Sequence, residues 1–174
     1  MRIVILATEP SGDFLGSELI KNLKKNKKVK ISGVGGQQMK DEGFHSWMSI
    51  NEFNAIGIYE VLIRIFKFLK IFKFIKRKII DFKPDILITI DSPSFSYRIV
   101  KSLQILRKKT KFIHYVAPTV WAWKSYRAKI FSELYDQMFT LFDFEPKYFK
   151  RCGLKTDFVG HQIIFKKNII KKKK

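Results

Sequence analysis

Short runs of apolar, β-branched residues alternate along the chain with longer stretches that have helical spacing. The runs "IVILA" (3–7) and "ILITI" (86–90) have the length and composition of buried strands. Between them, "FLGSELIKNLKK" (14–25) repeats its apolar residues at helical intervals. Because parallel strands are joined by a long crossover, usually a helix, this alternation indicates a parallel sheet. We therefore predict an α/β fold, a Rossmann-like parallel sheet with helices on both faces.

The same pattern accounts for most of the 174 residues. We expect one Rossmann-like domain over residues 1–162 and a basic tail over residues 163–174. The predicted strands are 2–7, 29–36, 86–90, 111–116, 137–142 and 156–160, and the predicted helices are 14–25, 37–43, 59–80, 95–108, 125–132 and 144–151.

The chain is strongly basic, with 35 lysines and arginines against 15 aspartates and glutamates and a formal net charge of +20. Such a charge attracts nucleic acid, anionic lipid or phosphorylated substrates. The alternative is a coding bias that favours lysine together with isoleucine, phenylalanine and asparagine. No nucleic-acid recognition motif is found, so nucleic acid is not an expected partner. The single cysteine, Cys152, fits a reducing compartment, and neither a metal site nor a cofactor is expected.

The first polar segment that follows a predicted strand is "TEPSGD". Gly12 permits a sharp turn or a close backbone approach to a ligand. Ser11 and Asp13 either cap the next helix or contact a ligand. Glu9 has no capping role to fill. Because ligands of such sheets bind beyond the carboxyl ends of the strands, these four residues are candidates for substrate binding.

A second polar segment, "DSPSFS", follows the buried strand "ILITI" and begins with Asp91. A carboxylate at the carboxyl end of a buried strand is partly shielded from water and suits a general base. The alternative is a structural acid that caps a helix or pairs with a lysine. Asp91 is the candidate catalytic residue.

Aromatic residues follow the next predicted strand, in "APTVWAWK". Trp121 and Trp123 offer broad ring faces that suit a sugar or an apolar substrate, and the alternative is a hydrophobic plug. Within the strand itself, His114 is more typical of a hydrogen-bonded core residue than of a catalyst.

The predicted helix at 59–80 mixes apolar residues with basic ones at 64, 67, 70, 73 and 76. A step of three residues drifts by about 60° per step on an α-helix, so these charges wind around it. Its charges also exclude a membrane span. The lysines could extend from an apolar body toward phosphate headgroups, and the alternative is a surface helix with one core stripe.

Several blocks together resemble the lipid-A-disaccharide synthase family. "ATEPSGDFLG", "GVGGQQMKDEG", "NAIGIYEVL", "DSPSFS", "IHYVAPTVWAWK" and "FVGH" occur here in the family's order. The resemblance implies the N-terminal domain of an inverting hexosyltransferase of the GT-B type. That enzyme transfers 2,3-diacylglucosamine from its UDP-sugar to 2,3-diacylglucosamine 1-phosphate in lipid A synthesis.

The resemblance also implies a setting for the chain. It implies a cytoplasmic protein, bound peripherally to the anionic inner face of the bacterial inner membrane. The family's UDP-sugar-binding domain is not expected within this chain, so turnover would need a separate donor-binding half. The alternative is a catalytically incomplete, membrane-surface lipid-binding module.

Carried onto the matching motifs, the resemblance makes Asp91 the essential aspartate and places the "EPSGD" segment on the acceptor side. Glu60, in the "NAIGIYEVL" block, is a further candidate for substrate binding. The residues expected to contact the membrane are Ile58, Leu62, Ile65, Phe66, Leu69 and Phe72.

Overall fold

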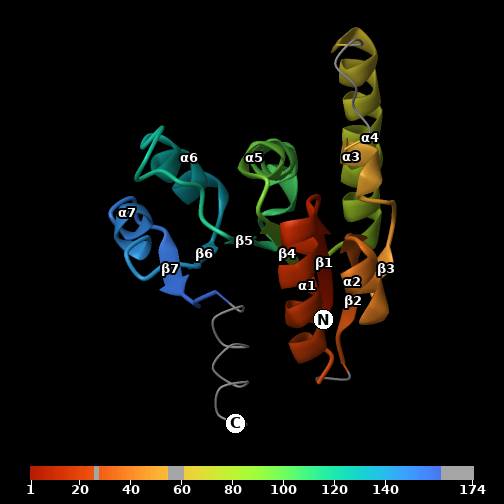
Figure 1. The fold of residues 1–174 in the computed structure, drawn as a ribbon, viewed down its shortest axis with the longest axis horizontal. Helices are drawn as coiled ribbons and strands as arrows, with labels where there is room; N and C mark the ends of the chain where they lie inside the picture. Colours follow the sequence, from red (N-terminus) through yellow and green to blue (C-terminus); the bar gives the residue numbers. More distant parts are fainter. Residues whose placement is uncertain (26–27, 55–60, 162–174) are drawn as a thin grey trace, which may run out of the picture.

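A computed structural model describes residues 1–25, 28–54 and 61–161, and gives only the backbone of residues 54 and 61–64. It contains a seven-stranded parallel sheet in the order β3-β2-β1-β4-β5-β6-β7 (Figure 1). The strands are β1 (Arg2–Ala7), β2 (Lys30–Val34), β3 (His45–Ser46), β4 (Ile86–Ile90), β5 (Lys111–Tyr115), β6 (Gln137–Thr140) and β7 (Lys155–Phe158). The predicted α/β, Rossmann-like fold class is confirmed.

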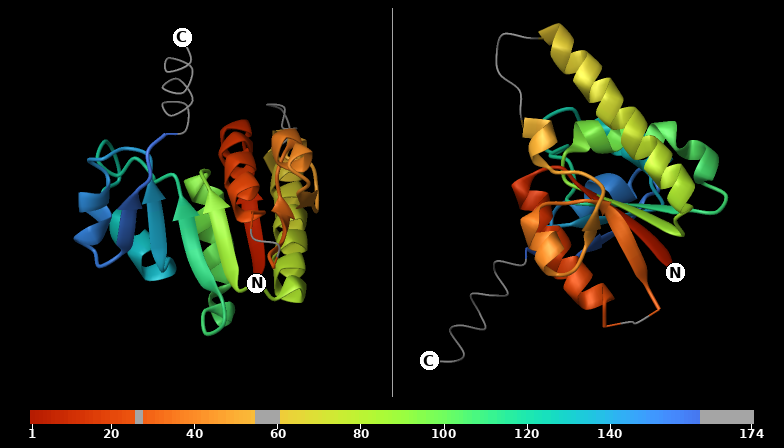
Figure 2. Two further views of the ribbon diagram at one scale, coloured as in Figure 1. Left: turned by 90° about the horizontal axis from the view of Figure 1, so that it is seen from below. Right: turned by 90° about the vertical axis from the view of Figure 1, so that its right-hand side faces the viewer.

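Helices join the strands and cover both faces of the sheet (Figure 2). They are α1 (Pro10–Leu23), α2 (Gln37–Asp41), α3 (Asn51–Asn54), α4 (Val61–Phe82), α5 (Pro93–Ser102), the 3-10 turn η1 (Gln104–Leu106), α6 (Arg127–Leu134) and α7 (Pro146–Lys150). The N-terminal end of α4 extends beyond the body of the sheet in both figures.

Alternating residues of the central strands pack into two separate hydrophobic cores, one on each face of the sheet. On one face, Ile3 and Ile5 of β1 pack with Leu15 of α1. On the other face, Val4 of β1 packs in a cluster that includes Ile79 of α4 and residues of α5 and α6. Both faces of the central strands are buried, which explains why they read as continuous apolar runs.

Two helices begin earlier than the sequence predicted. Helix α1 begins at Pro10 rather than residue 14, and α5 begins at Pro93 rather than residue 95. In both cases proline occupies the first helical turn, where its missing N–H costs nothing. The segments predicted as loops, "EPSGD" and "DSPSF", are therefore largely the first turns of helices.

Other differences are smaller. The predicted helix at 95–108 ends at Ser102 and is followed by η1. The short elements β3 and α3 were not predicted, because neither is long enough to show a period. The predicted basic tail at 163–174 lies outside the described residues, as do Ile58 and Glu60.

Candidate functional site

The strand order reverses between β1 and β4. The chain runs from β1 outward to β2 and β3, then crosses back to β4 on the other side of β1. The two strands pair in parallel, with Ala7 opposite Ile90 at their carboxyl ends. This is the switch point at which open α/β sheets bind ligands, and it brings the segments after β1 and β4 together.

The backbone turns sharply where β4 ends. Asp91 and Ser92 have φ angles of 56° and 44°, so two consecutive non-glycine residues adopt the left-handed conformation. Each such residue costs on the order of 1–3 kcal/mol and is held in place by its surroundings. Here the Asp91 N–H donates to the Tyr115 carbonyl at 2.9 Å, and the Ser96 hydroxyl donates to the Asp91 carbonyl at 2.8 Å. Strain of this kind is concentrated at functional sites.

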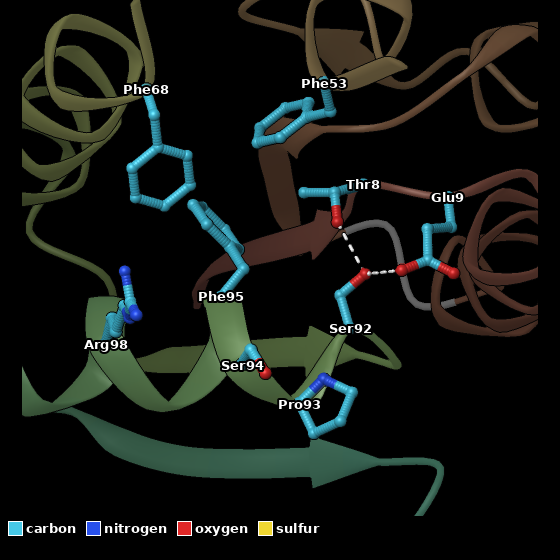
Figure 3. A pocket seen from close by; sticks show the side chains of 9 residues that line it. All are labelled: Thr8, Glu9, Phe53, Phe68, Ser92, Pro93, Ser94, Phe95 and Arg98. Atoms are coloured by element: carbon cyan, nitrogen blue, oxygen red, sulfur yellow. Dashed lines mark hydrogen bonds between the residues drawn. The ribbon is translucent and has the colours of Figure 1, made fainter. Parts of the chain in front are cut away.

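Hydroxyl groups orient both carboxylates at this switch point. The Ser11 hydroxyl donates to Asp91 Oδ2 at 3.0 Å, while the Ser92 N–H donates to Asp91 Oδ1 at 2.9 Å. The Thr8 hydroxyl donates to Ser92 Oγ at 2.7 Å, and the Ser92 hydroxyl donates in turn to Glu9 (Figure 3). The predicted residues Glu9, Ser11 and Asp91 are thus brought into one hydrogen-bonded group.

A cavity of about 420 Å³ opens beside this group. Its polar side is formed by Thr8, Glu9 and Ser92, and Figure 3 shows aromatic rings on its other side. Those rings are Phe53 and Phe68, whose centroids lie 5.3 Å and 6.2 Å from that of Phe95. We refer to this space as the switch-point cavity; it can take a ligand with hydroxyl groups at one end and an apolar group at the other.

Arg98 completes the lining of the switch-point cavity. Its guanidinium carbon lies 6.0 Å from the centre of the Phe68 ring, within the range of a cation–π contact. Asp91 is not itself a lining residue and reaches the cavity through its neighbour Ser92. Within the described residues, no group of three or more His, Cys, Asp or Glu side chains could hold a metal ion.

Asp13 does not suit the predicted substrate contact. Its side chain is buried, and its carboxylate accepts the backbone N–H groups of Gly36, Gln38 and Met39 at 2.8–3.1 Å. It therefore caps α2, a helix after the next strand, and not its own helix. Gly12 is also buried: an added Cβ would meet the Ala7 Cβ and the Ile90 carbonyl at 3.3 Å each. Gly12 lets α1 approach the two strand ends closely.

The two tryptophans line neither the switch-point cavity nor the second hollow described below. Trp121 packs edge-on against Phe144 at 5.4 Å, and its indole hydrogen-bonds to Glu145. Burial raises the pKa of Glu145, and the hydrogen bonds from this indole and from nearby backbone N–H groups offset that rise in part. Trp123 is 69% exposed, and its ring centroid lies 4.0 Å from Lys124 Nζ. Neither tryptophan therefore lines the cavity beside the Asp91 group.

His114 is a core residue, as predicted. Its Nδ1 lies 2.7 Å from the Thr89 hydroxyl, which also contacts the Tyr135 hydroxyl at 3.0 Å. Its Nε2 has no hydrogen-bond partner in the described part of the chain. Complete burial lowers the pKa of His114 to about 3, so the ring is neutral at pH 7.

Helix α4 exposes part of the surface that was predicted to contact a membrane. Ile65, Phe66 and Leu69 are 50%, 65% and 44% exposed. Phe72 is different, because it is half-buried and packs against the core cluster, which leaves little of it for a membrane. The side chain of Leu62 is outside the described part. No helix within 1–25, 28–54 and 61–161 combines the length and apolar composition that spanning a membrane requires.

Several residues of the switch-point cavity were not predicted from the sequence. Ser92 could have been found, since it lies within the "DSPSFS" segment that was singled out. Phe53 and Phe68 could not, because phenylalanine is frequent throughout this chain and nothing marks these two. Only the folded arrangement of α3, α4 and α5 brings them to one wall.

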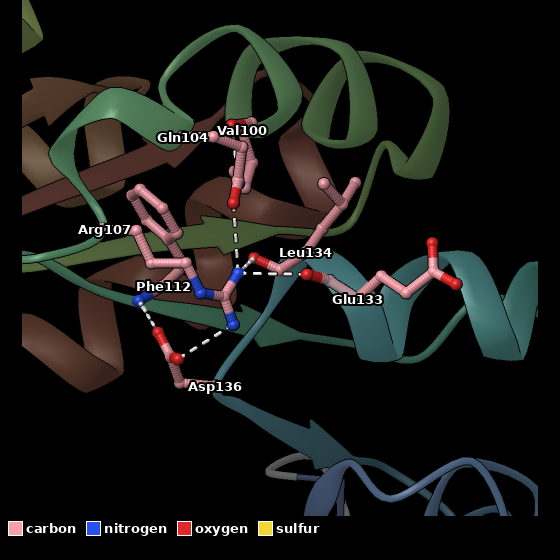
Figure 4. A network of polar contacts seen from close by, with 7 residues as sticks. All are labelled: Val100, Gln104, Arg107, Phe112, Glu133, Leu134 and Asp136. Carbon is pink, nitrogen blue, oxygen red and sulfur yellow. Dashed lines mark hydrogen bonds and ion pairs between the residues drawn. The ribbon is translucent and has the colours of Figure 1, made fainter.

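Polar groups at the opposite, amino edge of the sheet form a network with one another (Figure 4). The Arg107 guanidinium donates to the Glu133 and Leu134 carbonyls at 3.1 Å and 2.8 Å and pairs with Asp136 at 3.0 Å. The second oxygen of Asp136 accepts the Phe112 N–H at 2.7 Å. These groups are hydrogen-bonded to one another, and the network holds α6, β5 and β6 together.

Comparison with known proteins places the chain in a family. The family model described as lipid-A-disaccharide synthetase matches residues 3–174. The chain belongs to the lipid-A-disaccharide synthase family. Curated lipid-A-disaccharide synthases of Rickettsia bellii and Rickettsia felis are each 44% identical to it over 164 residues, and that of Rickettsia typhi is 42% identical.

These alignments cover 94% of this chain but 42–43% of each relative, so the chain spans less than half the length of the synthases it matches. A solved structure of Anabaena Alr3699/HepE in complex with UDP and glucose shares the fold, with a TM-score of 0.52 at 8% identity. That match covers 92% of this chain and 44% of the other. The membership confirms the resemblance noted from the sequence.

Proposed function

We propose that this domain binds the acceptor sugar of a lipid-A-disaccharide synthase and supplies the base of the transfer. The acceptor would be 2,3-diacylglucosamine 1-phosphate, and the donor would be UDP-2,3-diacylglucosamine. Family membership supports the reaction class. The observation that carries the assignment of roles is the pair of hydroxyl-oriented carboxylates, Glu9 and Asp91, beside a cavity with an aromatic wall. Carboxylates suit sugar hydroxyls, and phenylalanine rings suit acyl chains.

In this proposal Asp91 takes the proton from the attacking acceptor hydroxyl. As that oxygen bonds to C1 of the donor glucosamine, the bond from C1 to the UDP oxygen breaks and UDP leaves with the bonding electrons. Attack from the face opposite UDP inverts the configuration at C1, as the family resemblance implies. Ser11 and the Ser92 N–H hold both oxygens of Asp91, which fixes the direction in which it accepts a proton.

We propose that a donor-binding half, in the same polypeptide or in another, binds the UDP-sugar and stabilises the departing diphosphate. The expected location of the working enzyme is the cytoplasmic face of the inner membrane, where its acylated substrates lie.

The test mixes the purified chain with the C-terminal part of the Rickettsia bellii relative and follows UDP release from the two acylated substrates. Asp91→Asn should lower the rate by about 10²–10⁴-fold, the contribution typical of a positioned base. Asp81→Asn is the matched control, because Asp81 is an exposed carboxylate whose ion-pair partner, Arg77, is on its own helix. Absence of UDP release by the wild-type mixture, or an Asp91→Asn rate equal to that of Asp81→Asn, would refute the assignment.

The exposed apolar residues of α4 favour a second role, binding to a lipid surface. Ile65, Phe66 and Leu69 lie on the part of α4 where lysines are also frequent. Apolar side chains that enter the acyl boundary would bind a bilayer even when salt screens the lysines. This role either accompanies catalysis or, in a chain without turnover, stands alone as a lipid-binding module.

Liposome sedimentation separates insertion from charge. The chain should bind vesicles of phosphatidylglycerol and phosphatidylethanolamine and stay bound at high salt, where the Debye length is about 3 Å. Replacing Ile65, Phe66 and Leu69 by serine should abolish the salt-resistant part. Ile105→Ser is the control, because Ile105 is 83% exposed but lies in η1. Binding by the wild type that disappears at high salt would eliminate insertion.

A further inference from the structure

A second hollow, of about 240 Å³, lies between α5 and α6. We call it the helix-pair hollow. From α5 it is lined by Pro93, Ser94, Tyr97 and Arg98, and from the start of α6 by Tyr126, Arg127, Ile130 and Phe131. Its volume is below the roughly 300–1,000 Å³ typical of sites that enclose a whole ligand, so it suits one group of a larger molecule.

The polar lining of this hollow is cationic. Among the described residues its lining includes Arg98, Arg127, Tyr97 and Tyr126, and no aspartate or glutamate. The Tyr97 hydroxyl also accepts a hydrogen bond from Lys101 Nζ at 3.1 Å, which brings a third cation close. Arginine forks and tyrosine hydroxyls are donors that match the oxygens of a phosphate group.

Neither arginine forms an ion pair with a carboxylate within residues 1–25, 28–54 and 61–161. Arg107, by contrast, is paired with Asp136 and with two carbonyl groups. An arginine in a hollow without a carboxylate partner keeps its donors available for an anion.

The helix-pair hollow and the switch-point cavity are neighbours. Pro93, Ser94 and Arg98 line both, so the two spaces lie against the same part of α5. Arg98 stands at the boundary, with its guanidinium beside Phe68 of the switch-point cavity. A sugar near Glu9 and Ser92 would therefore have cations on one side of it, across the first turn of α5.

From this arrangement we infer that the helix-pair hollow binds the phosphate monoester of the acceptor sugar, with Arg98 and Arg127 as its ligands. This inference rests on the proposed function for the identity of the sugar. It makes the first turn of α5 a divider: the hydroxyl that reacts is held on the Asp91 side, and the phosphate that does not react is held on the α6 side.

The test measures binding of glucosamine 1-phosphate to the full chain by NMR titration. Arg98→Gln with Arg127→Gln should raise the dissociation constant at least tenfold. Lys108→Gln with Lys129→Gln removes the same charge from exposed positions outside both spaces, and should change it less than twofold. Equal effects of the two double variants would show attraction by net charge alone and would overturn the inference.

Further arms keep the test decisive. Arg98→Lys keeps the charge but loses the fork, so binding should weaken less than in Arg98→Gln; equal weakening by the two would argue against phosphate contact. If UDP binds more tightly than glucosamine 1-phosphate and shows the same dependence on the two arginines, the hollow binds the donor. That result would overturn the acceptor assignment. The titration needs no turnover, so arginine-dependent binding can be found even where Asp91→Asn leaves the rate of UDP release unchanged, which separates failure of this inference from failure of the proposed base.

Discussion

The two edges of the sheet carry the same kinds of residues and use them differently. At the amino edge, Asp85 and Asp136 directly precede β4 and β6, and each accepts a backbone N–H of a neighbouring strand, from Arg2 at 2.6 Å and Phe112 at 2.7 Å. At the carboxyl edge, Glu9 and Asp91 follow β1 and β4 and are held mainly by serine hydroxyls. The aspartates before these strands bond to a neighbouring strand, whereas the carboxylates after β1 and β4 bond to the segments that follow the strands.

Non-glycine residues with positive φ angles occur at both edges, since Lys83, shortly before β4, has a φ of 50°. The φ angles of Asp91 and Ser92 are positive, and so is that of Val116, at 77°, just after β5. A β-branched residue with positive φ is a true outlier. These three lie at the carboxyl edge. Because the side chains, and not the φ angles, differ between the two edges, we expect amino-edge variants to lower stability and carboxyl-edge variants to lower activity.

The largest expected effect on stability concerns His114, which lies within strand β5, between the two edges of the sheet. His114 has a pKa of about 3 in the folded domain and 6.5 when unfolded, so between these values the unfolded chain binds more protons. The unfolding free energy should therefore fall as the pH drops from 6.5 toward 3, by an amount on the order of 4 kcal/mol.

Urea unfolding at a series of pH values checks this prediction. His114→Gln should be less stable at pH 7, but its stability should depend less on pH below 6.5. A variant whose pH profile runs parallel to that of the wild type would show that other groups control acid unfolding.

The next largest effect belongs to the amino edge. Arg107→Met leaves Asp136 and two carbonyl groups without their cation, and should lower the unfolding free energy by about 2 kcal/mol. The rate of UDP release per folded molecule should not change. Urea denaturation measures the first quantity. Loss of rate without loss of stability would reverse the roles assigned to the two edges.

A smaller effect is expected for Ser92→Ala at the carboxyl edge. The change removes the hydroxyl that orients Glu9 but keeps the N–H that holds Asp91. The rate of UDP release should fall by about tenfold, equivalent to about 1.4 kcal/mol, while stability stays within about 1 kcal/mol of wild type. Steady-state kinetics with a parallel thermal melt test this. An unchanged rate would remove Ser92 from the site.

The smallest predicted effect concerns Gly12. Gly12→Ala places a methyl group 3.3 Å from both the Ala7 Cβ and the Ile90 carbonyl, so α1 must shift by a few tenths of an ångström. We expect a loss of about 1 kcal/mol in unfolding free energy and a modest fall in rate, because Ser11 moves with the helix. A thermal melt and a rate measurement on the same sample are sufficient. A gain in stability would show that the approach is not tight.

The sequence predicted the central strands well because a strand buried on both faces is a continuous apolar run, as in β1 and β4. It also predicted Asp91 and Glu9 as neighbours, because topology alone brings the ends of these strands together. The role of Asp13 could not be predicted, since its partners, near Gly36, are more than twenty positions away. Nor could the position of Trp121, which depends on Phe144 from another loop.

The central claim is that Asp91 acts in the reaction while Asp136 acts in the fold. The most direct measurement is the rate of UDP release per folded molecule in Asp91→Asn and in Asp136→Asn. Asparagine tolerates positive φ and retains a hydrogen-bond acceptor, so the first variant should fold normally. Its rate of UDP release should nevertheless fall by about 10²–10⁴-fold. The second should lose stability and keep its rate. Equal rates per folded molecule in the two variants would contradict the account.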